Sequence, residues 1–85
     1  MTRVKISDNQ IKYDQSHDVL HVFFYPEYLT TDDEEYPGIL IRRSIKDEQR
    51  IAGLTIMDFL KRKENSGLDQ LLPNYDFTNL TIANH

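Results

Sequence analysis

Residues 13–58, YDQSHDVLHVFFYPEYLTTDDEEYPGILIRRSIKDEQRIAGLTIMD, are the stretch of sequence that decides the fold. Short apolar runs rich in β-branched and aromatic residues alternate in it with polar clusters typical of turns. Together with the three residues that precede it, the stretch contains four such runs, at 10–14, 19–25, 39–45 and 51–57. We therefore expect a four-stranded antiparallel meander.

Proline and acidic residues separate the two halves of this stretch. Pro26 has no N–H to donate to a neighbouring strand, so it ends the second run. Residues 27–36 follow and include the acidic run Asp32-Asp33-Glu34-Glu35. We expect an exposed loop there, ended by Pro37-Gly38 where the third strand begins.

The alternation of side chains along a strand predicts which residues form the core. One face is expected to bury Leu20, Val22, Phe24, Ile39, Ile41, Ile45, Ala52, Leu54 and Ile56. The opposite face is less polar than a solvated sheet, since it carries Val19, Phe23, Tyr25, Leu40 and Met57 beside His21, Arg42 and Thr55. We expect another element or another chain to cover part of it.

Two short helices are predicted after the sheet. Asp58 is placed to cap a helix at about 59–64, which ends at Asn65-Ser66-Gly67. Ser66 and Asp69 have the spacing of a capping box that opens a second helix. The sequence thus predicts one α+β domain over residues 1–85, with the sheet at 10–57 and a C-terminal helix and tail at 66–85. The apolar tail is expected to dock on the sheet or to pair with a partner chain.

Composition limits the class of protein. Hydrophobic residues make up 39% and charged residues 28% of the chain, as in ordinary globular proteins. No apolar run is long enough to span a membrane, and the first residues lack the apolar core of a signal peptide, so a cytoplasmic location is expected. The chain has no cysteine, which excludes disulfides, thiolate zinc sites and cysteine catalysis.

The positions of several short motifs suggest a family. These are Tyr13-Asp14 with Asp18-Val19-Leu20, then Pro37-Gly38-Ile39, then Gly53-Leu54-Thr55-Ile56. In them the chain resembles a widespread family of small prokaryotic proteins, domain of unknown function 2283. The resemblance covers about half of the chain and implies a small sheet with a short helix, without an established activity. It also implies, for some members, a gene beside a small ribonuclease-like toxin.

The chain departs from that family at two places. Asp47-Glu48-Gln49 stands where the family often has a turn with glycine, and Thr55 stands where it often has an acid. The first departure changes the geometry of the turn, and the second weakens a catalytic interpretation.

Four potential metal ligands lie within eight residues, namely Asp14, Asp18, His17 and His21. A hairpin could bring His17 in the loop and His21 in the strand toward one divalent ion, but a metal site also requires all its ligands at the correct distances and angles. Aspartates beside a turn more often accept backbone N–H groups, and His21 faces away from the loop. We therefore expect neither a metal site nor a cofactor.

Charge is distributed in three blocks. Residues 1–36 carry eight acids and three bases, residues 37–63 carry three acids and seven bases, and residues 64–85 carry three acids and no base. Arg42 and Arg43 point to opposite faces of their strand, which argues against a basic patch for nucleic acid. The sequence also offers no acid and base pair at defined spacing, so we expect no enzyme.

A non-catalytic protein-binding module is the function we expect, with an antitoxin-like neutraliser of a small basic partner as its more specific form. The candidate partner-binding residues are Asp32, Asp33, Glu34, Glu35, Phe23, Tyr25 and Met57. The alternative is a structural homo-oligomer that buries its second sheet face against its own copy. Weaker alternatives are a divalent-metal-binding protein and a nucleic-acid accessory protein.

Overall fold

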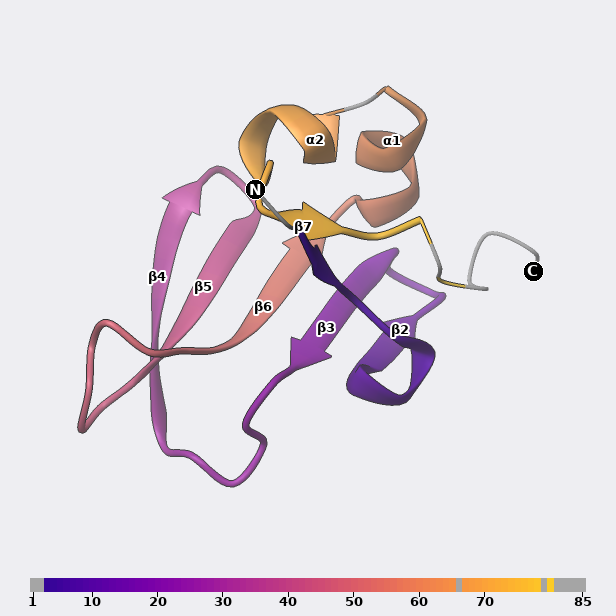
Figure 1. The fold of residues 1–85 in the computed structure, drawn as a ribbon. Helices are drawn as coiled ribbons and strands as arrows, with labels where there is room; N and C mark the ends of the chain where they lie inside the picture. Colours follow the sequence, from indigo (N-terminus) through magenta and orange to yellow (C-terminus); the bar gives the residue numbers. More distant parts are fainter. Residues whose placement is uncertain (1–2, 66, 79, 81–85) are drawn as a thin grey trace.

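A five-stranded antiparallel sheet and two short helices form the fold of the computed structural model, which describes residues 3–65, 67–78 and 80. The strands of the sheet are β2 (Ile11–Asp14), β3 (Val19–Phe23), β4 (Thr30–Tyr36), β5 (Ile39–Ser44) and β6 (Ile51–Met57). The helices are α1 (Phe59–Glu64) and α2 (Gly67–Leu71) (Figure 1). The predicted α+β class is confirmed.

The sheet has one strand more than expected, because the acidic run is not a loop. It lies in β4, which pairs with β5 along an antiparallel ladder. Asp32 stands opposite Arg42, and Thr31 opposite Arg43. Acidic residues are unfavourable in strands by themselves, but opposite charges across a ladder are stabilising. Arginines on the neighbouring strand therefore explain why this run is extended.

Strand order also differs from a simple meander. The order across the sheet is β2-β3-β6-β5-β4, so the chain crosses from β3 to the far edge and then returns through β4, β5 and β6. The most apolar strand, β6, thereby occupies the centre, and the acidic β4 occupies an edge. Charged edge strands are a common protection against unwanted pairing between sheets.

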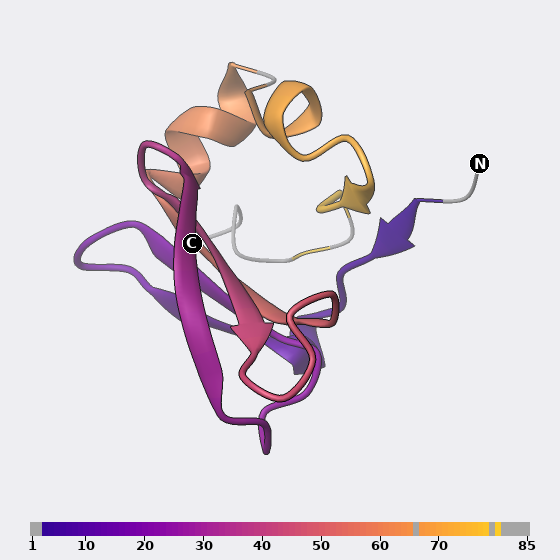
Figure 2. The ribbon, with the colours of Figure 1, turned by 90° about the vertical axis from the view of Figure 1, so that its left-hand side faces the viewer.

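One face of the sheet, here called the inner face, carries the core. Seven of the nine predicted core residues are buried, namely Leu20, Val22, Ile39, Ile41, Ala52, Leu54 and Ile56. They pack against Phe59, Leu68, Leu72, Phe77 and Leu80 from the C-terminal part and Ile6 from the N-terminal part. Figure 2 shows α2 and β7 (Tyr75–Asp76) to one side of the sheet. The described part of the tail therefore docks on its own chain.

The remaining two core predictions differ in outcome. Phe24 is half-buried and stacks on Tyr75, with ring centroids 5.9 Å apart. Ile45 is 58% exposed, and Ser44 is buried instead. Strand β5 ends at Ser44, just after a bulge at which Arg42 pairs with Gly53 but Arg43 pairs with Ile51. A bulge bends and twists the pair of strands locally, so the alternation does not extend to Ile45.

The cap of α1 comes from a different residue than the sequence predicts. Asp58 has a φ of 54° and makes no side-chain cap hydrogen bond. Leu60 N–H instead donates to both carboxylate oxygens of Asp18, at 3.1 and 3.2 Å, and Phe59 N–H donates to the Asp18 carbonyl. An aspartate of the β2–β3 turn therefore caps a helix 42 residues away in sequence.

The two ends of the described chain lie beside each other. Strand β1 (Val4–Lys5) pairs in parallel with β7, and the 3-10 helix η1 (Asp8–Gln10) leads into β2. The Arg3 guanidinium donates to the Asp69 carboxylate and to the carbonyls of Pro73 and Tyr75. In the predicted capping box, Ser66 lies outside the described residues, whereas Asp69 is engaged with Arg3.

Candidate functional site

The face of the sheet opposite the core, here called the outer face, is not covered by any element of the described chain. Side chains on it alternate with the buried ones along each strand. They are Lys12 and Asp14 from β2, Val19, His21 and Phe23 from β3, Thr55 and Met57 from β6, Leu40 and Arg42 from β5, and Asp32 and Glu34 from β4. Its centre is apolar and its margins are charged, which is the composition of a protein-binding surface.

Register aligns these side chains in rows across the sheet. One row runs Lys12, His21, Thr55, Leu40, Glu34, from one edge strand to the other. A second row runs Phe23, Gly53, Arg42, Asp32. Both rows cross β6, and the first has a lysine at one end and a glutamate at the other.

A glycine shapes the middle of the outer face. Gly53 lies between Phe23 and Arg42, and the Arg42 guanidinium carbon sits 5.3 Å from the centroid of the Phe23 ring. A Cβ at Gly53 would overlap the carbonyl oxygen of Val22, so any larger residue requires movement of the backbone. His21 stacks on Phe23 as well, with ring centroids 6.4 Å apart. The Phe23 ring is thus held by two neighbouring side chains, Arg42 and His21.

The predicted acidic partner-binding residues are all engaged within the chain. Arg43 binds Asp33 at 3.1 Å and Glu35 at 2.8 Å, and these carboxylates raise the pKa of the guanidinium, with the Glu35 hydrogen bond as the largest cause. Arg42 lies 3.7 Å from Asp32, and Glu34 accepts the Gly38 N–H. The arginines use different acids, as their predicted positions on opposite faces require. About half of the Asp32 and Asp33 side-chain surface remains exposed.

The three predicted apolar partner-binding residues lie in different places. Phe23 and Met57 are on the outer face, and Met57 is 44% exposed. Tyr25 lies beyond the end of β3, where its ring stacks on Tyr28 at 4.9 Å and the Arg50 guanidinium lies over it. Only the first two belong to the candidate surface.

The four candidate metal ligands serve other contacts. His17 Nδ1 lies 2.9 Å from Asp14 Oδ2, and this hydrogen bond is the main cause of the lowered pKa of Asp14. His21 Nδ1 lies 3.4 Å from Thr55 Oγ1, and Asp18 caps α1. Within the described residues, no three histidine, aspartate or glutamate side chains gather closely enough to hold an ion. Asp14 also accepts the His17 N–H, the turn role that its position predicts.

Asp18 has a structural role that the sequence does not reveal. Besides capping α1, it accepts a 2.7 Å hydrogen bond from the Tyr13 hydroxyl. Burial and then the contact with Asp18 raise the pKa of Tyr13 to about 12. The one available signal is the Asp-x-Leu motif that follows a Tyr-Asp pair, but it does not indicate that the partner is a distant helix.

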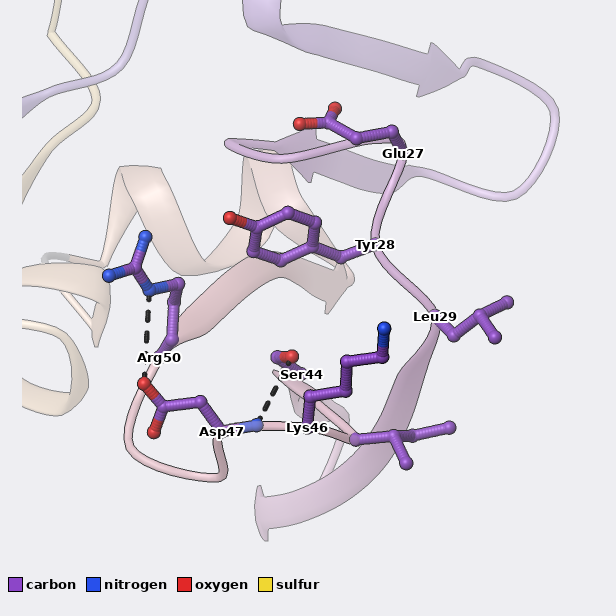
Figure 3. A pocket seen from close by; sticks show the side chains of 8 residues that line it. Glu27, Tyr28, Leu29, Ser44, Lys46, Asp47 and Arg50 are labelled. Atoms are coloured by element: carbon purple, nitrogen blue, oxygen red, sulfur yellow. Dashed lines mark hydrogen bonds and ion pairs between the residues drawn. The ribbon is translucent and has the colours of Figure 1, made fainter.

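A pocket lies at the end of the sheet, between the β3–β4 connection and the β5–β6 turn (Figure 3). Its lining combines Tyr28, Leu29 and Ile45 with the polar residues Glu27, Ser44, Lys46, Asp47 and Arg50. Ser44 Oγ accepts the Asp47 N–H at 3.4 Å, and Asp47 lies 4.0 Å from Arg50. No histidine lines the described pocket to activate this hydroxyl as a nucleophile.

Comparison with protein-family models, with curated proteins and with solved structures found no match for this chain. The resemblance to domain of unknown function 2283 therefore stays a prediction. No helix among the described residues is long and apolar enough to cross a membrane.

Proposed function

We propose that this chain is a non-catalytic protein-binding module that binds through the outer face of its sheet. The observation that carries the proposal is the uncovered face itself, which carries Phe23 at the end of β3 and Met57, 44% exposed, on β6. Aromatic residues, methionine and arginine are the types enriched at protein interfaces, and all three are present here. An aromatic side chain held in place also suits binding, because little side-chain entropy is lost on contact.

The non-catalytic part of the proposal is supported by the geometry of the titratable groups. Asp18 caps a helix, Asp14 closes a turn and Asp33 pairs with an arginine. Catalysis by general acid and base needs such groups in a cleft with displaced pKa values. Tyr13, whose pKa is raised to about 12, is instead tied to Asp18 at the start of α1.

A small basic protein is a second candidate partner, and the exposed edge of β4 favours it. Asp32 and Asp33 keep about half of their side-chain surface in solvent on an edge strand. An added strand with lysine or arginine would repeat on the free side of β4 what Arg42 and Arg43 do on the other. This is the neutralising role that the sequence suggests for an antitoxin-like protein.

Affinity capture from the native lysate at low salt tests the proposal. The baits are the wild-type chain, Phe23→Asp on the outer face, and Lys46→Asp on the β5–β6 turn as a matched control. We expect wild type and control to capture the same partner in equal amounts and Phe23→Asp to lose it, because a carboxylate buried in an interface is desolvated without a counter-charge. Circular dichroism checks that each bait is folded.

Two results would contradict this proposal. Equal capture by Phe23→Asp and wild type would remove the outer face from binding. Loss of capture after Asp32 and Asp33 are changed to Asn, with Phe23→Asp still active, would place the binding at the β4 edge, where association should slow with salt.

A further inference from the structure

We propose that the partner of the outer face is a second copy of this chain, bound face to face about a two-fold axis that runs along β6. This inference rests on the proposed function and names its partner. It follows from the strand order and from the rows of side chains on the outer face.

Strand β6 is the middle one of five, with two strands on each side. A two-fold axis above and along β6 therefore places β3 over the β5 strand of the second copy and β2 over its β4 strand. Each row of the outer face then meets the same row of the second copy in reverse order. Sheets that pack face to face keep their strands within about 30° of each other, which this arrangement satisfies.

The two rows are complementary when reversed in this way. In the first row Lys12 meets the second copy's Glu34, His21 meets Leu40, and Thr55 meets itself on the axis. In the second row Phe23 meets Arg42, and Gly53 meets itself. Every contact off the axis occurs twice, so the interface holds two lysine–glutamate pairs and two arginine–phenylalanine contacts.

Like charges are kept apart by the same operation. Asp14 lies in a third row, with Val19 and Met57, so it does not meet the second copy's Glu34. Asp32 lies in the row of Phe23, which passes outside the start of β2, so it does not meet the second copy's Asp14. An axis across the strands would instead place β4 over β4 and bring the acidic strands of the two copies together. Charge complementarity therefore selects the axis along β6.

The size of the face predicts the strength of the association. Five strands spaced about 4.8 Å apart and about six residues long give a footprint on the order of 400–500 Å². That is below the roughly 800 Å² per partner of a standard stable interface. The dimer should therefore dissociate on dilution, with monomer and dimer both observable in a concentration series.

Charge reversal tests the inference by sedimentation equilibrium. Lys12→Glu alone places two glutamates opposite each other, and Glu34→Lys alone places two lysines opposite each other. We expect each single variant to dimerise about tenfold more weakly than wild type, as the loss of two exposed ion pairs implies.

Mixing the two variants provides the rescue. An equimolar mixture of Lys12→Glu and Glu34→Lys should recover the dimer, because position 12 of each copy then meets the opposite charge at position 34 of the other copy. Lys46→Glu and Glu48→Lys, on the exposed β5–β6 turn, are the matched controls, and we expect both to dimerise like wild type.

The outcomes separate this inference from the proposed function. Wild type that remains monomeric at all concentrations overturns the inference, as does a mixture no better than the single variants. If wild type is monomeric but still captures another protein in a Phe23-dependent way, the proposed function stands with a different partner. If Phe23→Asp captures as well as wild type while the charge-reversal pattern holds, the outer face serves self-association alone.

Discussion

Asp18 connects the β2–β3 turn with the start of α1 and with Tyr13 on β2. Its carboxylate binds the Leu60 N–H and the Tyr13 hydroxyl, and its own φ is 54°, in the left-handed region. Aspartate and asparagine tolerate this conformation better than most residues because their side chains hydrogen-bond locally. Asp18 therefore has three structural roles: it caps α1, it binds the Tyr13 hydroxyl and it adopts the left-handed conformation of the turn.

Two substitutions of Asp18 should separate these roles. We expect Asp18→Ala to lower the free energy of unfolding by about 1–3 kcal/mol, through the lost cap and the less tolerant backbone conformation. Asp18→Asn keeps an acceptor and the backbone preference, so its loss should be clearly smaller. Urea denaturation measures both variants, and equal stability of Asp18→Ala and wild type would contradict the role assigned to the carboxylate.

Strand β4 is the element whose stability depends on another element. Its acids are compensated by Arg42 and Arg43 on β5, and its outer edge is unpaired in the described chain. An edge strand with few buried side chains is expected to open locally before the sheet unfolds. Loss of Arg43 should therefore weaken the pairing of β4 with β5 more than it lowers the stability of the whole domain.

Removal of Arg43 should loosen β4 without unfolding the protein. In Arg43→Met the amides of β4 are expected to exchange hydrogen several-fold faster, because Asp33 and Glu35 lose a partner worth about 1 kcal/mol or less in total. Arg43→Lys keeps the charge but cannot bind both acids with a planar fork, so it should lie between. Mass-spectrometric hydrogen exchange measures this, with β6 amides as the internal control. Uniform acceleration in β4 and β6 would mean that the effect is global.

At the scale of the whole molecule, alkaline pH should destabilise the protein through a partly buried tyrosine. The pKa of Tyr13 is raised to about 12 from 10, so the folded state holds this proton more tightly than the unfolded state does. The corresponding stability is fully present below pH 10 and is lost as pH rises toward 12. Burial also raises the pKa of Tyr75, which adds to the loss.

A Tyr13→Phe variant isolates this contribution. Its free energy of unfolding should fall less steeply than that of wild type between pH 10 and 12, with a residual slope from Tyr75. Denaturant titrations at a series of pH values measure the difference. Identical slopes for the variant and wild type would show that Tyr13 does not govern the alkaline transition.

Part of the candidate site follows from sequence pattern alone. Period two in β3 and β6 places Phe23 and Met57 on the face opposite Leu20 and Leu54, and it identifies that face as unusually apolar. The pattern does not single out Lys12 or Glu34, since their importance arises from register across five strands. The need for glycine at position 53 is hidden for the same reason, because it arises from the close approach of the Val22 carbonyl on the neighbouring strand β3.

The sequence by itself determined the α+β class, the strands β3, β5 and β6, most of the inner core and the helix after Asp58. These depend on alternation and on turn and breaker residues, which act over a few positions along the chain. Only the tertiary structure decided that the acidic run is a strand, that β6 lies between β3 and β5, and that Asp18 caps α1. Each depends on a partner distant in sequence: arginines that compensate acids, apolar strands that exclude a charged one from the centre, and a turn that meets a helix end. Local pattern does not specify such partners, because they are chosen by packing and charge in three dimensions.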